Sequence, residues 1–468
     1  MKNLFSVSAV ILAASAVVVP ATVSAQSQRG LEARSRAAQF WTSERRANAI
    51  PRDLVIDEHG LGYIRGRGGQ LIPHGHDIAA QAGKPSGGGG DTTGPTYGAM
   101  SPSNTTVGAS ATLSVAVADP SGVKSVSISV RKGSGTAQSF AASQGGGGVW
   151  SVSLSGFTDG AWSWWAVGKD NAKPSNTSTS EIANFTVNTS GGGGGPGPGT
   201  VPNDEWTEGG LVQQAAGRIY FEMPANKRRT RWDGYVCSGT VAADTSTGRS
   251  IVITAAHCVY DDANKAYARN VLFIPNQAGT TGAGTDLNCA NDPKGCWAPD
   301  FGVVDVNWTT RTFPDNVAWD YAFYVFDDAG SHSGNGAGGA LDAAVGAMTV
   351  QFTSPSVGVL THALGYSYSE DPDFMYCADP MTIEGAVNWW LPNCGLSGGA
   401  SGGPWFQPVN GGNGSIMSVN SWGYTTMPGM AGPKLSGTSA QCVFNVARGY
   451  ALGSNYADGN AGVTVTCP

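Results

Sequence analysis

The chain has 468 residues, a length that predicts about three domain-sized units. Only 13% of the residues are charged, 68 are glycine, and the formal net charge of −7 is not concentrated in any long run. This composition gives no sign of a nucleic-acid-binding surface and is typical of β-rich exported proteins with many turns and linkers.

Residues 1–25 predict a signal peptide. Lys2 supplies a positive start, residues 4–19 are mostly apolar, and residues 23–25 are small, as a cleavage site requires. A membrane anchor is the alternative, but the apolar stretch is short and no later stretch is long enough to span a bilayer. A lipoprotein anchor is also not expected, because no cysteine directly follows the cleavage site. We therefore expect a secreted protein without a membrane anchor, extracellular or periplasmic in transit.

Residues 26–86 are polar, and their first periodic stretch is "LVIDEHGLGYI". We expect a propeptide that is removed during maturation; a partly disordered N-terminal arm is the alternative. Two glycine-rich runs, "PSGGGGDTTGP" at 85–95 and "SGGGGGPGPG" at 190–199, predict linkers, because glycine-rich chains gain little by ordering. The second run defines a Gly/Pro linker at 189–200.

Residues 92–188 predict an immunoglobulin-like (Ig-like) β-sandwich. Residues 113–117 and 126–130 alternate apolar and polar side chains, and "GVWSVSL", "GAWSWWAV" and "IANFTV" follow between turns. About a hundred residues of such strands without cysteine are similar to bacterial sandwiches of this kind. Four tryptophans are candidates for a surface- or polysaccharide-binding platform, although core packing is expected for at least half of them: Trp150, Trp162, Trp164 and Trp165.

Residues 201–468 are again rich in short strands, such as "SIVITAAHC", "YAFYVF" and "SIMSVNSWG". Short strands with many Gly/Pro turns favour an all-β domain built of two barrels. All eight cysteines lie here, and an even number confined to one region of an exported protein favours disulfides over metal ligands. Pairing in sequence order is the simplest of many connectivities: Cys237 with Cys258, Cys289 with Cys296, Cys377 with Cys394, and Cys442 with Cys467.

The stretch "GGASGGPWF" places Ser401 in the motif Gly-x-Ser-Gly-Gly-Pro, followed by apolar residues. The tripeptide Ser-Gly-Gly alone is a weak signal, because it also starts at Ser86 and Ser190 in the linkers and at Ser397. The wider motif therefore predicts the nucleophile. A serine hydroxyl needs an adjacent base, and an imidazole suits this role because its pKa lies near 7.

His257 is the candidate base among the six histidines. It ends an apolar strand in "TAAHC", where Cys258 can tether the strand end to Cys237 on the neighbouring strand. The other histidines lie in the expected propeptide (His59, His74, His76), in an apparent loop (His332) and further along the chain (His362).

The third member of such a set is a buried carboxylate that holds the imidazole tautomer and stabilises its charged form. Asp320 in "AWDYAFYVF" opens an apolar strand and is the first candidate. Asp315, in a Pro-containing turn, and Asp327, beside Asp328 at the strand end, are its competitors.

In this order, "TAAHC", "WDYA", "GASGGP" and "SWG" resemble the secreted bacterial trypsin-like (chymotrypsin-fold) serine peptidases. "GYVCSGT", "ALGY" and the spacing from Cys394 to Ser401 are similar to the glutamyl-endopeptidase-related branch. The resemblance covers about residues 205–468 and implies a chymotrypsin-type double β-barrel.

The resemblance also implies a role for each matching position. Ser401 would attack the scissile carbonyl, His257 would take its proton, and Asp320 would orient His257. The N–H groups of Gly399 and Ser401 would form the oxyanion hole. The substrate would pair as an added strand with the backbone of three residues: Ser421, Trp422 and Gly423.

Two features depart from the family's pattern. Ala400 stands where the family usually has an aspartate that pairs with the new N-terminal ammonium after zymogen cleavage. We therefore expect another way of ordering the oxyanion turn, such as the Cys377–Cys394 bridge. No acidic residue precedes Ser401 in "NCGLSGGA", and Ser421 stands where a glutamyl peptidase would have His, so a neutral or apolar specificity pocket is the default expectation.

We therefore expect a secreted serine endopeptidase that cleaves proteins or peptides through an acyl-enzyme, with no cofactor, metal or nucleic-acid partner. A catalytically inactive, peptidase-like surface-binding protein is the main alternative, and the presence of all three triad residues in the expected order argues against it. An esterase with the same triad is a third class, but its nucleophile would normally precede its histidine in the chain.

Overall fold

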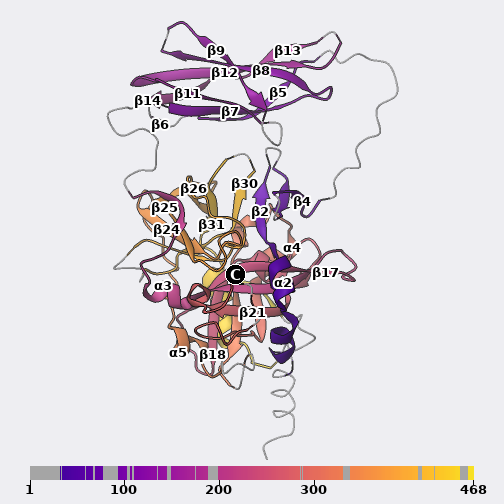
Figure 1. Cartoon of the computed structure of the whole chain (residues 1–468), viewed down its shortest axis with the longest axis vertical. Helices are drawn as coiled ribbons and strands as arrows, with labels where there is room; N and C mark the ends of the chain where they lie inside the picture. Colours follow the sequence, from indigo (N-terminus) through magenta and orange to yellow (C-terminus); the bar gives the residue numbers. More distant parts are fainter. Residues whose placement is uncertain are drawn as a thin grey trace, which may run out of the picture.

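The structure, a computed structural model, consists mainly of β-strands joined by short helices and loops (Figure 1). It describes residues 32, 34–57, 60–66, 69–76, 93–102, 106–107, 110–133, 135–144, 149–173, 175–187, 199–284, 286, 288–329, 332, 338–408, 414–425, 427–453 and 462–467. The expected signal peptide and most of both glycine-rich runs lie outside these residues. The predicted all-β fold class is confirmed. Within the described ranges, no helix is long and apolar enough to cross a membrane.

The described part of residues 93–187 is a β-sandwich. One sheet has the order β10–β11–β7–β5, and the other has the order β6–β14–β12–β8–β9 with β13 paired to β12. Alternate side chains from both sheets, such as Leu113 and Ile128, form a single buried core. The strands are β5 (Thr96–Ser101), β6 (Thr106–Val107), β7 (Ser110–Ala118), β8 (Val123–Lys132), β9 (Gln138–Ala141), β10 (Ser143–Gln144), β11 (Val149–Ser155), β12 (Gly160–Asp170), β13 (Thr177–Thr179) and β14 (Ala183–Val187).

The four tryptophans of the sandwich do not form one binding platform. Trp150 and Trp164 are buried in the core. Trp162 lies on the same face of β12 as Trp164 and packs edge-on against Phe157, whereas Trp165 points to the opposite face. Core packing therefore accounts for at least half of the four tryptophans, as expected. The alternation of side chains along β12 places Trp162 and Trp165 on opposite faces of the sheet.

The first half of the C-terminal region is one sheet with the order β21–β16–β17–β18–β23–β22–β32. Its strands β18 and β23 are almost wholly buried, in keeping with the continuous apolar runs "SIVIT" and "AFYVF". The strands are β16 (Ala216–Pro224), β17 (Trp232–Ala242), β18 (Arg249–Thr254), β21 (Arg269–Pro275), β22 (Phe301–Asp305), β23 (Ala322–Asp327) and β32 (Gly462–Val465), with β19 (Tyr260–Asp261) and β20 (Ala266–Tyr267) paired separately.

The second half contains two sheets. One has the order β15–β25–β24–β28–β29. The other has the order β26–β27–β31–β30 and continues into three strands near the N-terminus, β2 (Asp53–Ile56), β3 (Gly62–Arg65) and β4 (Leu71–Pro73). The strands of the second half are β15 (Val201–Glu205), β24 (Leu360–Gly365), β25 (Met375–Pro380), β26 (Thr382–Glu384), β27 (Asn388–Leu391), β28 (Pro404–Phe406), β29 (Ser418–Val419), β30 (Trp422–Tyr424) and β31 (Met430–Pro433). The helices of the C-terminal region are α3 (Gly210–Ala215), η2 (Ala256–Cys258), η3 (Gln277–Gly279), α4 (Val306–Thr310), η4 (Val317–Trp319), α5 (Leu341–Val345) and α6 (Ala440–Gly449).

The eight cysteines form four disulfides in sequence order, as the simplest connectivity predicted. Cys237–Cys258 links β17 to η2, which carries His257, and so fixes the backbone around this histidine. The other three bridges are Cys289–Cys296, Cys377–Cys394 and Cys442–Cys467.

Residues 34–76 are folded against the C-terminal region wherever the structure describes them. This differs from the partly disordered N-terminal arm that was the alternative to a propeptide. Trp41 is fully buried, and Arg34 forms an ion pair with the buried Asp300 at 3.0 Å. In Figure 1 the β2 strand of this segment lies beside β30. The elements of the segment are α2 (Ser43–Asn48), β1 (Ile50–Pro51), β2 (Asp53–Ile56), β3 (Gly62–Arg65) and β4 (Leu71–Pro73).

Candidate active site

His257 and Asp320 form a buried pair between the two halves of the C-terminal region. The ring Nδ1 of His257 lies 2.7 Å from Asp320 Oδ2, and the His257 amide N–H donates to Asp320 Oδ1 at 2.9 Å. Because the carboxylate accepts a hydrogen bond, it favours the tautomer with the proton on Nδ1, which leaves Nε2 able to take a proton. This is the arrangement that a general base requires.

The competitors of Asp320 have other environments. Asp315 is exposed, and Asp327 forms an ion pair with Arg34 at 3.1 Å. Asp320 itself does not open the strand, as the sequence suggested, because β23 begins at Ala322; it ends the short helix η4 instead. The turn, rather than the strand, aims the carboxylate at His257.

Ser421 contacts the same carboxylate. Its buried side-chain hydroxyl donates a short hydrogen bond to Asp320 Oδ2. Sequence reasoning assigned only the Ser421 backbone to substrate binding, so the hydroxyl is a part of the site that it missed. Together with the His257 amide and ring, this hydroxyl gives the buried carboxylate three hydrogen-bond partners, which fix its orientation.

The turn before Ser401 has the shape that an oxyanion hole needs. Gly399 adopts φ +99°, and a Cβ at this position would lie 2.9 Å from the carbonyl oxygen of Tyr366. Only glycine fits both conditions. Among the hydrogen bonds of the described residues, the N–H groups of Gly399 and Ser401 have no acceptor, so both can donate to an incoming carbonyl oxygen.

Ser238, which sequence reasoning missed, holds this turn in place. Its hydroxyl donates to the carbonyl oxygen of Gly399 at 2.9 Å and accepts the amide N–H of Tyr366 at 2.8 Å. Its own amide N–H donates to the carbonyl oxygen of Ser401 at 2.7 Å. The sequence "CSGT" marks Ser238 as a residue beside a cysteine. Its contacts with Gly399 and Ser401 could not be predicted, because they join distant parts of the chain.

Ala400 is fully buried in an apolar cluster with Cys377, Cys394 and Trp405. The Cys377–Cys394 bridge therefore lies beside the turn, as expected from the sequence. The amide of Asn420 adds a second anchor, because its Nδ2 donates to the carbonyl oxygens of Ala400 at 2.9 Å and Leu364 at 2.8 Å. Polar contacts to the backbone thus order a turn that lacks the usual carboxylate.

The hydroxyl of Ser401 bonds to the N-terminal segment and not to the base. It donates to the carbonyl oxygen of Arg52 at 3.0 Å, and His257 Nε2 is buried without a hydrogen-bond partner among the described residues. For attack, the serine oxygen would have to face the carbonyl carbon and pass its proton to the imidazole. The carbonyl of Arg52 is therefore held in a geometry that does not favour attack.

The N-terminal segment pairs with the backbone that the sequence analysis assigned to substrates. Strand β2 runs parallel to β30, with Leu54 opposite Trp422 and Val55 opposite Gly423. Strand β1 runs parallel to β17. A Cβ at Gly398 would lie 2.6 Å from the Pro51 side chain, so glycine at this position permits the close approach. The Trp422 side chain faces the core, which leaves its backbone to pair with β2.

Two basic side chains of the segment contact two adjacent aspartates. Arg52 Nη2 lies 3.3 Å from Asp261 Oδ2, and His74 Nε2 lies 2.7 Å from Asp262 Oδ1. Burial alone would raise the pKa of Asp262, but the charge of His74 and several hydrogen bonds lower it to about 2. Burial raises the pKa of Asp53 to about 6, against the opposite effects of Arg65 and His257.

The remaining histidines that the structure describes lie elsewhere. His332 is buried and contacts the carbonyl oxygens of Ala298 and Asp327, while His362 packs among Trp206 and other aromatic rings. Burial lowers the pKa of His332 to about 4. His59 lies outside the described residues.

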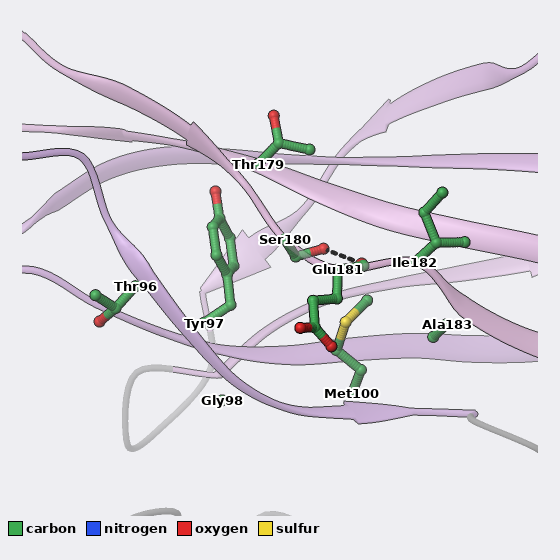
Figure 2. Close-up of a pocket in the computed structure, with 9 residues that line it drawn as sticks. All are labelled: Thr96, Tyr97, Gly98, Met100, Thr179, Ser180, Glu181, Ile182 and Ala183. Carbon is green, nitrogen blue, oxygen red and sulfur yellow. Dashed lines mark hydrogen bonds between the residues drawn. The ribbon is translucent and has the colours of Figure 1, made fainter.

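A separate hollow of about 550 Å³ lies on the sandwich, where β5 meets the segment between β13 and β14 (Figure 2). The hydroxyl of Tyr97, the aromatic side chain of its lining, already donates to the carbonyl oxygen of Ser178 at 2.6 Å and accepts the amide of Gly168 at 2.6 Å. Met100 and the exposed Glu181 also line the hollow (Figure 2). This mixed lining points to no ligand class, and binding by the sandwich stays a prediction.

No family model and no curated protein matches the chain. Among solved structures, the chain is similar to the protease Anisep from Arthrobacter nicotinovorans, with 27% identity over 53% of this chain and 99% of that chain, at a TM-score of 0.41. It is also similar to the thermostable serine protease AL20 from an extremophilic microorganism, with 28% identity over 51% of this chain and 98% of that chain, at a TM-score of 0.40. At these TM-scores the activity is inferred from the residues of this chain and not from the two likenesses.

Proposed function

We propose that the chain is a secreted serine endopeptidase of the trypsin-like class, made as a latent precursor. The observation that carries the proposal is the convergence of the His257–Asp320 pair, the open N–H groups of Gly399 and Ser401, and a peptide carbonyl on the Ser401 hydroxyl. A nucleophile, a base and oxyanion donors are the groups that peptide-bond cleavage requires.

In the proposed mechanism, Ser401 attacks the carbonyl carbon of a substrate while His257 Nε2 takes the hydroxyl proton. The N–H groups of Gly399 and Ser401 stabilise the oxyanion, and His257 then donates its proton to the leaving amine. Asp320 and the Ser421 hydroxyl stabilise the imidazolium that forms in between. Water releases the acyl group from Ser401 in the second half of the cycle.

Latency follows from the position of residues 50–56. They pair with β17 and β30, and their Arg52 carbonyl takes the hydrogen bond that Ser401 would otherwise offer to His257. Substrates that pair with the same backbone are excluded while the segment is bound. We therefore propose that residues 26–86 are a propeptide. The membership of the glutamyl-endopeptidase-related branch stays a prediction.

A fluorophosphonate probe tests the proposal, because it reacts with a serine only where a base and an oxyanion hole activate it. After the segment has been removed from the folded protein, Ser401 should be labelled, and Ser401→Ala should remove both the labelling and all peptide cleavage without changing the thermal transition. Processed protein that shows no label at Ser401 would be the inactive, surface-binding alternative.

A further inference from the structure

The guanidinium of Arg52 occupies a pocket that belongs to the catalytic region. Its Nε donates to the carbonyl oxygen of His257 at 2.7 Å, and its Nη2 donates to Asp261 at 3.3 Å. The guanidinium carbon lies 4.9 Å from the centre of the Tyr235 ring. The Arg52 side chain is fully buried. A carbonyl, a carboxylate and an aromatic face are three groups that each favour a cation.

This pocket adjoins the reacting centre. The carbonyl oxygen of Arg52 accepts the Ser401 hydroxyl at 3.0 Å, while the Arg52 amide N–H donates to the carbonyl oxygen of Val236 at 3.2 Å. Arg52 therefore contacts the nucleophile through its backbone and fills the pocket with its side chain. A substrate residue whose backbone lies beside Ser401 and β17 can place its side chain in the same pocket.

The lining of the pocket is fixed without help from the N-terminal segment. Asp261 Oδ1 accepts the amide N–H of Asn264 at 2.7 Å, and the Asn264 side chain is held by the carbonyl oxygen of Pro224 at 2.9 Å. The neighbouring Asp262 accepts the amide of Phe313 at 2.6 Å. The pocket would keep its shape and its negative charge after the segment has left.

The two carboxylates make the pocket strongly anionic once it is empty. Ligand atoms of Asp261, Asp262 and His74 lie within 4.8 Å of one another, and the segment supplies the basic side chain that contacts each aspartate. When Arg52 and His74 leave together, two carboxylates that the folded precursor buries lose these basic partners. Such a site gains most from a substrate side chain that brings a positive charge.

We propose that this pocket, lined by Tyr235, the His257 carbonyl and Asp261, is a substrate subsite that selects an arginine or lysine side chain next to the cleaved bond. The inference rests on the proposed peptidase function and deepens it by naming a substrate class. It concerns the side of the groove formed by β17, and it is compatible with a neutral pocket beside "NCGLSGGA" on the other side. Arg52 occupies the subsite as the side chain of a bound inhibitor.

The test compares fluorogenic peptides that carry either arginine or its neutral isostere citrulline, moved one position at a time along the peptide. The enzyme is the full chain with Leu54→Ala, which loosens β2. At one position next to the cleaved bond, kcat/KM should be about 10- to 100-fold higher for arginine than for citrulline, as expected for a charge-assisted hydrogen bond. Lysine should lie between the two, because it offers a single point charge.

Asp261→Asn in the same chain should reduce the arginine-to-citrulline ratio to about 1–2, because the amide keeps the Oδ1 acceptor for Asn264 and loses the charge. Tyr235→Leu provides a second variant, and we expect it to lower the ratio by about 2- to 5-fold through the lost ring face. Asp233→Asn is the matched control, since Asp233 is a partly exposed carboxylate on the same strand and should leave the ratio unchanged.

The outcomes separate the subsite from the function. A chain that is labelled at Ser401 and cleaves peptides, but prefers arginine at no position or keeps its preference after Asp261→Asn, overturns the subsite alone. A chain that neither reacts with the fluorophosphonate nor cleaves any peptide overturns the proposed function and the subsite with it.

Discussion

At the scale of single residues, the site depends on hydroxyl groups that surround the triad. Ser421 donates to the carboxylate that orients His257, and Ser238 donates to the turn that carries Gly399 and Ser401. Each hydroxyl replaces water at a buried polar group, so its loss removes a hydrogen bond that buried solvent does not readily restore. The geometry of the nucleophile is therefore maintained by side chains that touch neither substrate nor reacting atoms.

Ser238→Ala should loosen the oxyanion turn. The substitution leaves the Gly399 carbonyl and the Tyr366 amide without their shared partner, so the turn that carries the Gly399 N–H loses one of its anchors. We expect kcat to fall by about 10- to 100-fold with little change in KM, because the N–H acts mainly in the transition state.

Two measurements separate this positioning role from a loss of stability. A peptide aldehyde, whose adduct places an oxyanion in the hole, should lose affinity in parallel with kcat, while the thermal midpoint should fall by only a few degrees. Equal aldehyde affinity in wild type and Ser238→Ala would contradict the assignment.

His257 and Ser401 could be predicted because each lies in a local motif, and Asp320 because it precedes an apolar strand. Ser238 and Arg52 could not be predicted, since their contacts join residues 161 and 349 positions apart in the chain. Ala400 could be read as a missing carboxylate, but the polar contacts that replace it appear only in three dimensions.

At the scale of elements, the pairing of β2 with β30 is the contact that closes the groove. Leu54 is fully buried in the core of the C-terminal region, whereas Leu71 in β4 of the same segment is 41% exposed. Leu54 therefore contributes to the hold of the segment, whereas Leu71 contributes little. The periodic stretch "LVIDEHGLGYI" indicated strands here, but its partner could not be known from the sequence alone.

The ionisation of Asp53 should make the hold of β2 depend on pH. The ordinary pKa of this carboxyl is 3.8, and burial raises it to about 6, so the folded segment favours the protonated form. The resulting stabilisation is present below about pH 4 and is lost as the pH rises through 6, by up to about 3 kcal/mol.

Hydrogen exchange of residues 50–56 measures this effect in the Ser401→Ala chain, which cannot cleave itself. After correction for the intrinsic exchange rate, protection should be higher at pH 4 than at pH 7 in this background. With Asp53→Asn added, the difference in protection between pH 4 and pH 7 should become smaller, because residue 53 no longer titrates. A pH dependence that is the same with and without Asp53→Asn would show that Asp53 does not control the segment.

At the scale of the whole molecule, the chain combines a sandwich, a C-terminal region of two halves and an N-terminal segment whose strands pair with both halves. The all-β class and the disulfide order could be predicted, because alternation and cysteine spacing are local properties. The pairing of β2 with β30 could not be predicted, because it joins residues that are far apart in the chain. The proposed latency is therefore a property of the assembled chain and not of any single motif.

The rate at which a fluorophosphonate labels Ser401 in the intact, folded full chain tests the central claim most directly. Leu54→Ala should remove about 2–5 kcal/mol of packing from β2 and accelerate labelling at least about 10-fold over wild type. Leu71→Ala, the same change at an exposed position of the segment, should label as slowly as wild type, and Arg52→Ala provides a second loosened chain. Fast labelling of the wild-type chain, equal to that of Leu54→Ala, would show that the segment does not block the site, and no labelling in any of these chains would show that Ser401 is not an active nucleophile.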